Sequence, residues 1–267
     1  MHVNLRKSLF ILPNLFTVSG IFCGFYALML SRAGATDKDL YKASLLIIFA
    51  MFFDIIDGRV ARLTKTQSAF GMQLDSLADV IAFGVAPAVL VHTWALSSIG
   101  PVGLFACFAY VACGAIRLAR FNVISTGRDG APKKPDKYIL GLPIPGAAGI
   151  LVSLIAANHA VDGSLASARS VVLAIVVALA FFMVSTIKFR SFKDLKLNAR
   201  TVSLVAFAVG SSVILALQIH LVFALGWLLT SYVAIGLAES ALALGRRVVR
   251  KPPPEEQEEQ AAPIRRR

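Results

Sequence analysis

Long apolar stretches separated by shorter polar ones run through nearly the whole chain. A helix of about 20 apolar residues is long enough to cross the hydrocarbon core of a bilayer. The pattern therefore predicts an all-α fold, a polytopic membrane helix bundle of about eight transmembrane helices. The expected helices cover residues 12–30, 41–63, 76–96, 101–120, 142–159, 170–187, 201–218 and 221–244.

The two ends of the chain are polar and set the domain limits. Residues 1–11 are predicted to form a short interfacial helix that leads into the first span. Residues 246–267 combine dense charge with three consecutive prolines, so we expect a disordered cytoplasmic tail there. The sequence is thus divided into a transmembrane domain, 1–245, and this tail.

The position of the basic residues predicts the orientation. The chain has 267 residues, of which 57% are hydrophobic and only 16% charged, a composition typical of membrane proteins. Of the 27 lysines and arginines, 23 lie in the termini and connectors on one side of the expected bundle. Such residues collect on the cytoplasmic side, so both termini are expected in the cytoplasm. The protein is then a multi-pass protein of the inner or plasma membrane.

The same placement bears on the possible partners of the protein. The net charge of +12 is compatible with nucleic-acid binding. However, the basic residues flank apolar stretches, where they favour anionic membrane lipid and phosphorylated substrates as partners. We therefore expect no nucleic acid partner.

Four aspartates stand out in DIIDGRVARLTKTQSAFGMQLDSLAD, which follows a long apolar stretch. Asp54 and Asp57 are three residues apart, and Asp75 and Asp79 are four apart, so each pair shares one face of a helix. Carboxylate ligands without nearby His or Cys favour one or two hard divalent ions, Mg²⁺ or Mn²⁺. The alternative is that these carboxylates pair with the neighbouring basic side chains, which are Arg59, Arg62 and Lys65.

The whole pattern, D-x2-D-G-x2-A-R-x8-G-x3-D-x3-D, resembles the signature of the CDP-alcohol phosphotransferases, membrane enzymes of phospholipid synthesis. The resemblance implies that an alcohol displaces CMP at the β-phosphorus of a CDP-linked lipid. It also implies a catalytic core at about residues 12–187 and a homodimer. By motif position, Asp54, Asp57 and Asp75 are expected as metal ligands, with Asp79 as both general base and a further ligand.

The resemblance also implies a set of contacts to CDP-diacylglycerol. For Gly58 the alternative is close packing against a neighbouring helix. For the N-x2-T pattern of the first span the alternative is a helix cap and an ordinary hydrogen bond between helices. The expected nucleotide-lipid contacts are Asn14, Thr17, Gly58, Ala61, Arg62, Ser68 and Gly71.

Four local segments, PNLFTVSGIFCGF, LDSLADVIAFGVAP, IRLARFN and GLPIP, are similar to the bacterial and archaeal phosphatidylserine synthase branch of that family. This branch implies L-serine as the acceptor, the other possibilities being inositol phosphate and glycerol 3-phosphate. Arg117, Arg120 and Asn122 are candidates to bind the serine carboxylate, or else anchors to anionic lipid.

A cation transporter is the competing hypothesis from another functional class, because aspartates within a membrane often mark an ion path. A transporter predicts acidic residues near mid-membrane in the two halves of an inverted repeat. Here all four aspartates fall within one 26-residue stretch at one edge of the expected bundle. The pattern therefore favours the transferase.

The orientation can be tested by cysteine labelling in intact cells, in a background without the native cysteines. Single cysteines at Ser68 and Arg128 should resist an impermeant thiol reagent, because both positions lie on the predicted cytoplasmic side. A cysteine at Gly34 should react. Labelling of the first two positions from outside would contradict the orientation.

Overall fold

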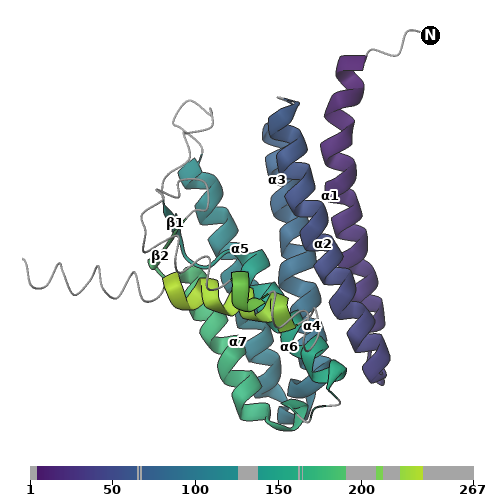
Figure 1. Cartoon of the computed structure of the whole chain (residues 1–267), viewed down its shortest axis with the longest axis vertical. Coiled ribbons are helices and arrows are strands. Elements are labelled where there is room, and N and C mark those ends of the chain that lie inside the picture. The colour runs from purple at the N-terminus through teal and green to yellow at the C-terminus, as the bar shows by residue number, and fades with distance from the viewer. Residues whose placement is uncertain are drawn as a thin grey trace, which may run out of the picture.

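A computed structural model describes residues 5–64, 66, 68–125, 138–161, 163, 165–190, 209–212 and 223–236. Helices make up most of this part of the chain (Figure 1). The α-helices are α1 (Leu5–Leu30), α2 (Asp37–Leu63), α3 (Ala69–Asp79), α4 (Ala86–Val91), α5 (Pro101–Ser125), α6 (Ile144–Ala160) and α7 (Arg169–Val184). The π-helical segments are η1 (Val80–Val85) and η2 (His92–Leu96), and the 3₁₀ turns are η3 (Ser97–Ile99) and η4 (Leu165–Ser167). A further helix, Phe223–Gly236, follows.

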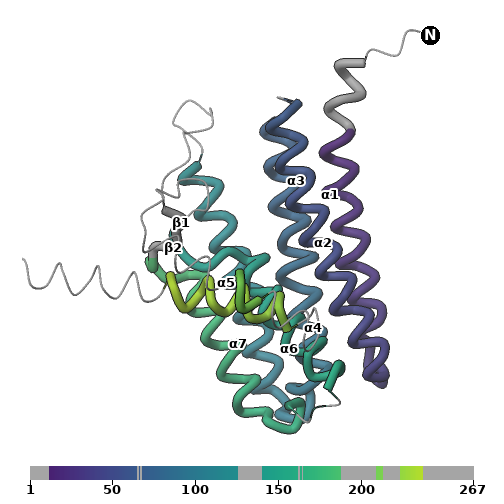
Figure 2. Tube along the Cα trace, viewed as in Figure 1, coloured from purple at the N-terminus to yellow at the C-terminus, as the bar shows by residue number. Residues whose placement is uncertain are grey.

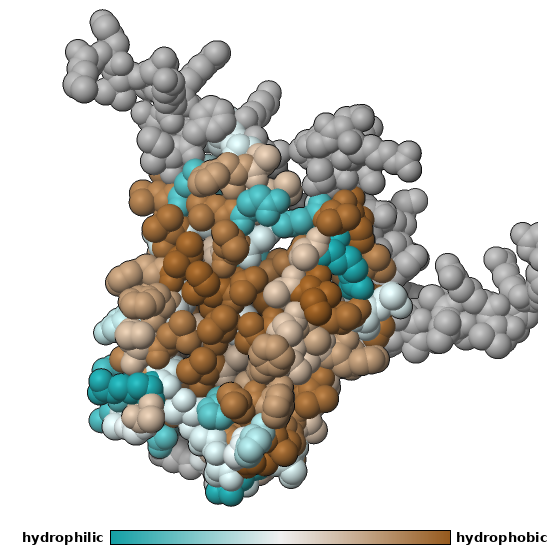
Figure 3. All heavy atoms as spheres, turned by 180° about the vertical axis from the view of Figure 1, so that it is seen from behind, coloured by the Kyte–Doolittle hydropathy of each residue, from teal (hydrophilic) through white to brown (hydrophobic). Residues whose placement is uncertain are grey.

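The described helices support the expectation of a membrane helix bundle. Three of them are long and apolar enough to cross a bilayer: Leu12–Leu30, Ala69–Ile99 and Pro101–Ser125. Large apolar side chains cover most of the face seen in Figure 3, and polar residues gather toward its ends. Apolar side chains on the outside of a helix bundle are stable in contact with lipid.

The number of spans stays a prediction. The expected span 201–218 lies almost wholly outside the described residues, as do the tail 246–267 and the connector 191–200. The last expected span, 221–244, is described only as the helix Phe223–Gly236. In Figure 2 this yellow-green helix lies at a steep angle to α5 and α7 rather than alongside them.

Two sequence expectations about local structure are corrected. The described part of the expected interfacial helix, residues 5–11, is continuous with the first span in α1, which accommodates Pro13 within it. A short antiparallel ribbon also joins β1 (Tyr138–Leu140) to β2 (Lys188–Arg190), next to the ends of α5 and α7. Three residues per strand give no periodic pattern to detect in the sequence.

The helices form two groups that meet at the buried core. In Figure 1, α1, α2 and α3 lie side by side, and α5, α6 and α7 stand next to them. Helix α1 packs along α2 and also contacts α3, while α6 joins the groups by packing on α2. Helix α1 comes close to the third span at Gly24, where a Cβ would lie 2.8 Å from the Ala82 Cα. Glycine there allows the two backbones to come together.

The turn between α2 and α3 is short because each helix end is satisfied locally. The Thr64 and Thr66 N–H groups donate to the Val60 and Ala61 carbonyls at the end of α2. Ser68 is the N-cap of α3, and its hydroxyl accepts a hydrogen bond of 3.0 Å from the Gly71 N–H. The expected polar connector 64–74 therefore becomes helical from Ala69 onward.

Candidate active site

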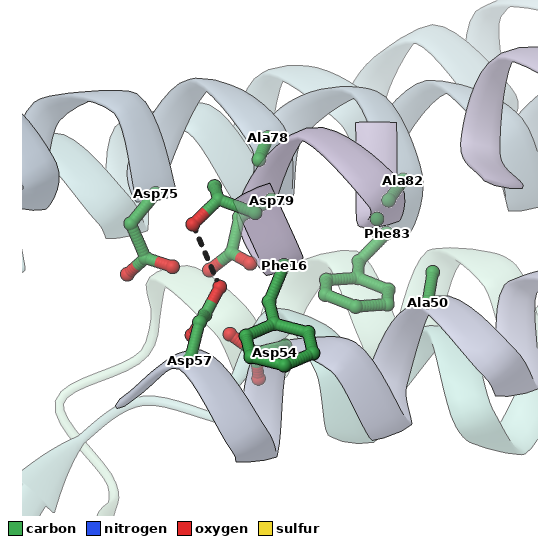
Figure 4. A pocket seen from close by; sticks show the side chains of 11 residues that line it. Phe16, Ala50, Asp54, Asp57, Asp75, Ala78, Asp79, Ala82 and Phe83 are labelled. Carbon is green, nitrogen blue, oxygen red and sulfur yellow. Dashed lines mark hydrogen bonds between the residues drawn. The ribbon is translucent and has the colours of Figure 1, made fainter. Parts of the chain in front are cut away.

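Three of the four aspartates meet at one point between α2 and α3. Asp54 and Asp57 project from α2 and Asp75 from α3, and one carboxylate oxygen of each lies within 4.8 Å of the others. Figure 4 shows these side chains pointing toward one another across the space between the two helices. The spacing of three residues on α2 places both of its carboxylates on the facing side.

Asp79 lies one turn further along α3 and lines the same cavity, but it is outside this set of three. Its side chain is only 8% exposed. Three of the four carboxylates that were expected to converge do so. The fourth, that of Asp79, lies beside them in the same cavity. The cavity is lined by Phe16, Thr17, Gly20, Ala50, Asp54, Asp57, Asp75, Ala78, Asp79, Ala82 and Phe83.

The two phenylalanines of this cavity were not singled out from the sequence. Phe83 follows Asp79 by four residues and Phe16 precedes Thr17, so the i, i+4 spacing was a usable signal for the first. Phe83 is 2% exposed. Together with the alanines in the lining, these rings give the cavity apolar walls beside the carboxylates.

Thr17 of α1 holds one of the clustered carboxylates. Its side chain is buried, and its hydroxyl lies 2.8 Å from Asp57 Oδ2, to which it donates the hydrogen bond drawn as a dashed line in Figure 4. The same hydroxyl lies 3.2 Å from the Pro13 carbonyl. The structure thus shows the hydrogen bond between helices, which orients Asp57, and a contact of Thr17 with the nucleotide stays a prediction.

Asn14 and the first turn of α3 lie close together at the entrance side of the cluster. The Asn14 Oδ1 is 3.7 Å from the position that a Cβ on Gly71 would occupy, and the Ser68 hydroxyl is 3.2 Å from it. A side chain at position 71 would therefore be crowded by the Ser68 hydroxyl and the Asn14 amide. Nucleotide contacts by these three residues stay a prediction.

Gly58 has no close helix neighbour among the described residues. A Cβ built there would meet only the Arg62 guanidinium of this part of the chain, at 3.6 and 4.0 Å. The described helices therefore give no support to the packing alternative, and a nucleotide contact at Gly58 stays a prediction. Arg62 is exposed and Ala61 is half-buried, so the backbone surface around Gly58 is open to a ligand.

The alternative of charge pairing is also disfavoured. No ion pair within 4.0 Å joins the clustered carboxylates to Arg59 or Arg62, and both arginines are exposed. Lys65 lies outside the described residues. Neither Arg59 nor Arg62 therefore brings a cationic side chain to contact distance of the clustered carboxylates.

The cluster fits a hard divalent ion. Its donor atoms are all carboxylate oxygens, which Mg²⁺ and Mn²⁺ prefer. With metal–oxygen bonds of about 2.1 Å, ligand oxygens around one Mg²⁺ are about 3–4 Å apart. Small side-chain rotations from the observed 4.8 Å spread are therefore enough to surround one ion.

Arg117 of α5 lies buried next to this site. It is 7% exposed, its Nε has no hydrogen-bond partner in the structure, and its guanidinium lies 5.7 Å from the centre of the Phe121 ring. It is near enough to Asp79, and to Tyr232 of the last described helix, to interact electrostatically with both. A buried guanidinium with spare hydrogen-bonding capacity is suited to an anionic group.

The other two candidates for the acceptor site bind neighbouring helices. Arg120 donates through Nη1 to the Val184 carbonyl at 2.9 Å and through Nη2 to the Ser185 carbonyl at 3.1 Å. These carbonyls end α7, where a helix lacks its own donors. Asn122 donates to the Ser76 hydroxyl at 2.8 Å, next to Asp75. The three candidates thus have separate surroundings in the structure, and their binding of serine stays a prediction.

Comparison with known proteins covers the whole acidic motif. The CDP-alcohol phosphatidyltransferase family matches residues 10–184. The CDP-diacylglycerol–serine O-phosphatidyltransferase of Helicobacter pylori strain 26695 is 39% identical over 197 residues, covering 74% of this chain and 79% of that protein. The protein of that name from Bacillus subtilis is 33% identical over 183 residues, covering 68% and 91%. The one from Saccharomyces cerevisiae is 36% identical over 158 residues, covering 57% and 56%.

The bond between Thr17 and Asp57 gives a test of the metal site. Thr17→Val removes the hydroxyl and keeps the shape, so Mn²⁺ affinity should fall by about 10–100-fold, as is usual when a partner of a metal ligand is lost. Thr17→Ser keeps the hydroxyl and should bind nearly as the native protein does. Mn²⁺ binding is measured by electron paramagnetic resonance. Equal affinities for the valine and serine variants would show that this hydrogen bond is not needed.

Proposed function

Because this chain belongs to the CDP-alcohol phosphatidyltransferase family, we propose that it transfers the phosphatidyl group of CDP-diacylglycerol to L-serine, giving phosphatidylserine and CMP. The observation that carries this proposal is the cluster of Asp54, Asp57 and Asp75, which fits a divalent ion and lies within the family match. The relatives named as serine O-phosphatidyltransferases, at 33–39% identity, support serine as the acceptor.

The alternatives differ in how much they explain. Inositol phosphate or glycerol 3-phosphate as acceptor keeps the same chemistry, but the relatives cited above carry serine in their names. A cation transporter requires an ion path through the bundle, whereas the cluster lies near the turn that joins α2 to α3. Membership of a transferase family also argues against transport.

The roles proposed for the aspartates follow from their positions. Asp54, Asp57 and Asp75 would hold Mg²⁺ or Mn²⁺, as one or two ions, and the bound metal supplies positive charge to the diphosphate. Asp79 is free of this set and lines the same cavity, so it is placed to accept the proton of the serine hydroxyl. A role for Asp79 as a further ligand is the less favoured assignment.

The transfer then balances as a displacement at phosphorus. The serine hydroxyl oxygen forms a bond to the β-phosphorus, the bond from that phosphorus to the bridging oxygen of CMP breaks, and the hydroxyl proton passes to Asp79. CMP leaves with the electron pair of the broken bond. The chain's own contribution is to position the two reactants and to hold one proton.

Substrate contacts are proposed on each side of the cluster. On the nucleotide side these are Asn14, Gly58, Ala61, Arg62, Ser68 and Gly71, which lie on α1 and around the turn between α2 and α3. On the acceptor side, the burial of Arg117 beside Asp79 supports its binding of the serine carboxylate. The bonds that Arg120 and Asn122 make to α7 and α3 support a positioning role for them instead.

Location and assembly complete the proposal. The excess of basic residues on one side of the expected bundle supports an inner or plasma membrane protein with its active site at the cytoplasmic face. A homodimer is proposed from the family resemblance alone. Chemical cross-linking in native membranes tests it, and a product with the mass of one chain only would argue against it.

The reaction is tested with purified protein, CDP-diacylglycerol and a panel of alcohols, while CMP release is followed. We expect L-serine to give the fastest release, because the similar proteins are named as serine O-phosphatidyltransferases. EDTA should abolish activity, and added Mg²⁺ or Mn²⁺ should restore it. Faster release with inositol phosphate or glycerol 3-phosphate would overturn the acceptor and leave the reaction class intact.

A pair of substitutions separates the proposed base from the ligands. Asp79→Asn keeps the shape of the side chain but cannot take a proton, so turnover should fall by about 10²–10⁴-fold with Mn²⁺ binding largely kept. Asp54→Asn should lose metal affinity as well, and high Mn²⁺ should partly restore its activity. If high Mn²⁺ brings Asp79→Asn to near native turnover, Asp79 is a ligand and not the base.

A further inference from the structure

A proline interrupts the helix that carries Asp75 and Asp79. Pro87 lies at the start of α4, and it has no N–H. Because residue 87 cannot donate, one carbonyl in the turn before it loses its backbone donor. In a membrane-type bundle such a group needs another partner, because lipid offers none.

Tyr110 of α5 supplies a donor to this turn. Its hydroxyl donates a hydrogen bond of 3.1 Å to the Phe83 carbonyl. Tyr110 is 0% exposed, so its hydroxyl is out of reach of water. A side chain from a neighbouring helix thus supplies a hydrogen bond to the turn that Pro87 leaves one donor short.

The backbone around Phe83 is wider than an α-helix. The Val80 N–H donates to the Leu77 and Ser76 carbonyls, three and four residues back, whereas the Ala86 N–H donates to the Ile81 carbonyl, five residues back. At the end of α4 the His92 N–H again donates to carbonyls three and four residues back. The π-helical segment η1 therefore begins directly after Asp79 and ends at Val85, two residues before Pro87.

The π-helical segment η1 affects which side chains of the third span face the cavity. One extra residue in a turn offsets the helix faces on its two sides by about 100°. Before η1, Asp75 and Asp79 face the cavity, and after it most of α4 is buried in the core. Within η1, the Phe83 ring lines the same cavity, while its carbonyl is the group that Tyr110 holds.

We infer that Tyr110 is a positioning residue for the reaction: its hydroxyl supplies a donor to the turn that Pro87 leaves one donor short, and so fixes the π-helical segment next to Asp79 that carries Phe83 to the cavity. The catalytic part of this inference rests on the proposed function. Tyr110 itself touches no clustered carboxylate in the structure, so it acts through the backbone of the third span.

A double-mutant cycle on the full chain tests the inference, with Tyr110→Phe, Pro87→Ala and the two combined. In the native background, Tyr110→Phe should lower kcat about tenfold through misplacement of Asp79. The KM for CDP-diacylglycerol should change by less than about twofold, and the midpoint of thermal unfolding in detergent should fall. In the Pro87→Ala background, position 87 regains a backbone donor, so the same loss of the hydroxyl should cost less than about twofold.

Equal losses from Tyr110→Phe in both backgrounds, or no loss in the native one, would overturn the inference. If Tyr110→Phe does not fold, recovery of folded protein in the double variant supports it, and failure to recover contradicts it. Tyr26→Phe is the matched control, because Tyr26 is 46% exposed on α1, and it should leave kcat within about twofold of native.

The two readouts keep this inference apart from the proposed function. The unfolding midpoints need no substrate, so they report the coupling of Tyr110 to Pro87 even if the native protein releases no CMP with serine. Turnover is followed with whichever acceptor supports CMP release. A coupled midpoint together with uncoupled turnover would limit Tyr110 to a role in stability and overturn its positioning role.

Discussion

Repulsion among three carboxylates is the constraint on which the rest of this structure depends. Like charges 4 Å apart repel by about 4 kcal/mol at an effective dielectric constant of ~20, and Asp54, Asp57 and Asp75 come within 4.8 Å of one another. Such a cluster persists only where the surrounding helices hold it and a cation binds to it. The fold meets the first condition, and the oxygen-only donor set suits the second.

Helix α1 helps to hold the carboxylate cluster in place, because it contacts both helices that carry the cluster. Gly24 lets α1 approach the third span closely at Ala82, and Thr17 adds a hydrogen bond to Asp57. Close backbone contact and a polar bond are the two means by which helices associate where lipid removes the hydrophobic driving force. The first helix therefore acts as a support for the site as well as a span.

On the other side, α5 supports the acid-bearing span through polar contacts at several levels. Tyr110 binds the Phe83 carbonyl, and Asn122 binds Ser76 near the end of the helix. Arg120 joins the same helix to the end of α7. A π-helical segment and a proline are costly in an isolated helix, and the Tyr110 hydroxyl offsets part of that cost by pairing with a backbone carbonyl of the π-helical segment.

The sequence by itself determined the helical class, the positions of the first six helices with ends that differ by up to seven residues, and the identity of the acidic cluster. Apolar length and the spacing of Asp54, Asp57, Asp75 and Asp79 are local properties, so they can be read without coordinates. Only the tertiary structure decided which partner each polar side chain takes. It paired Thr17 with Asp57, directed Arg120 to the end of α7 and left Asp79 beside the cluster. It also brought Tyr110 to the Phe83 carbonyl in the turn before Pro87. These contacts join residues far apart in sequence, so their meeting depends on how the helices pack.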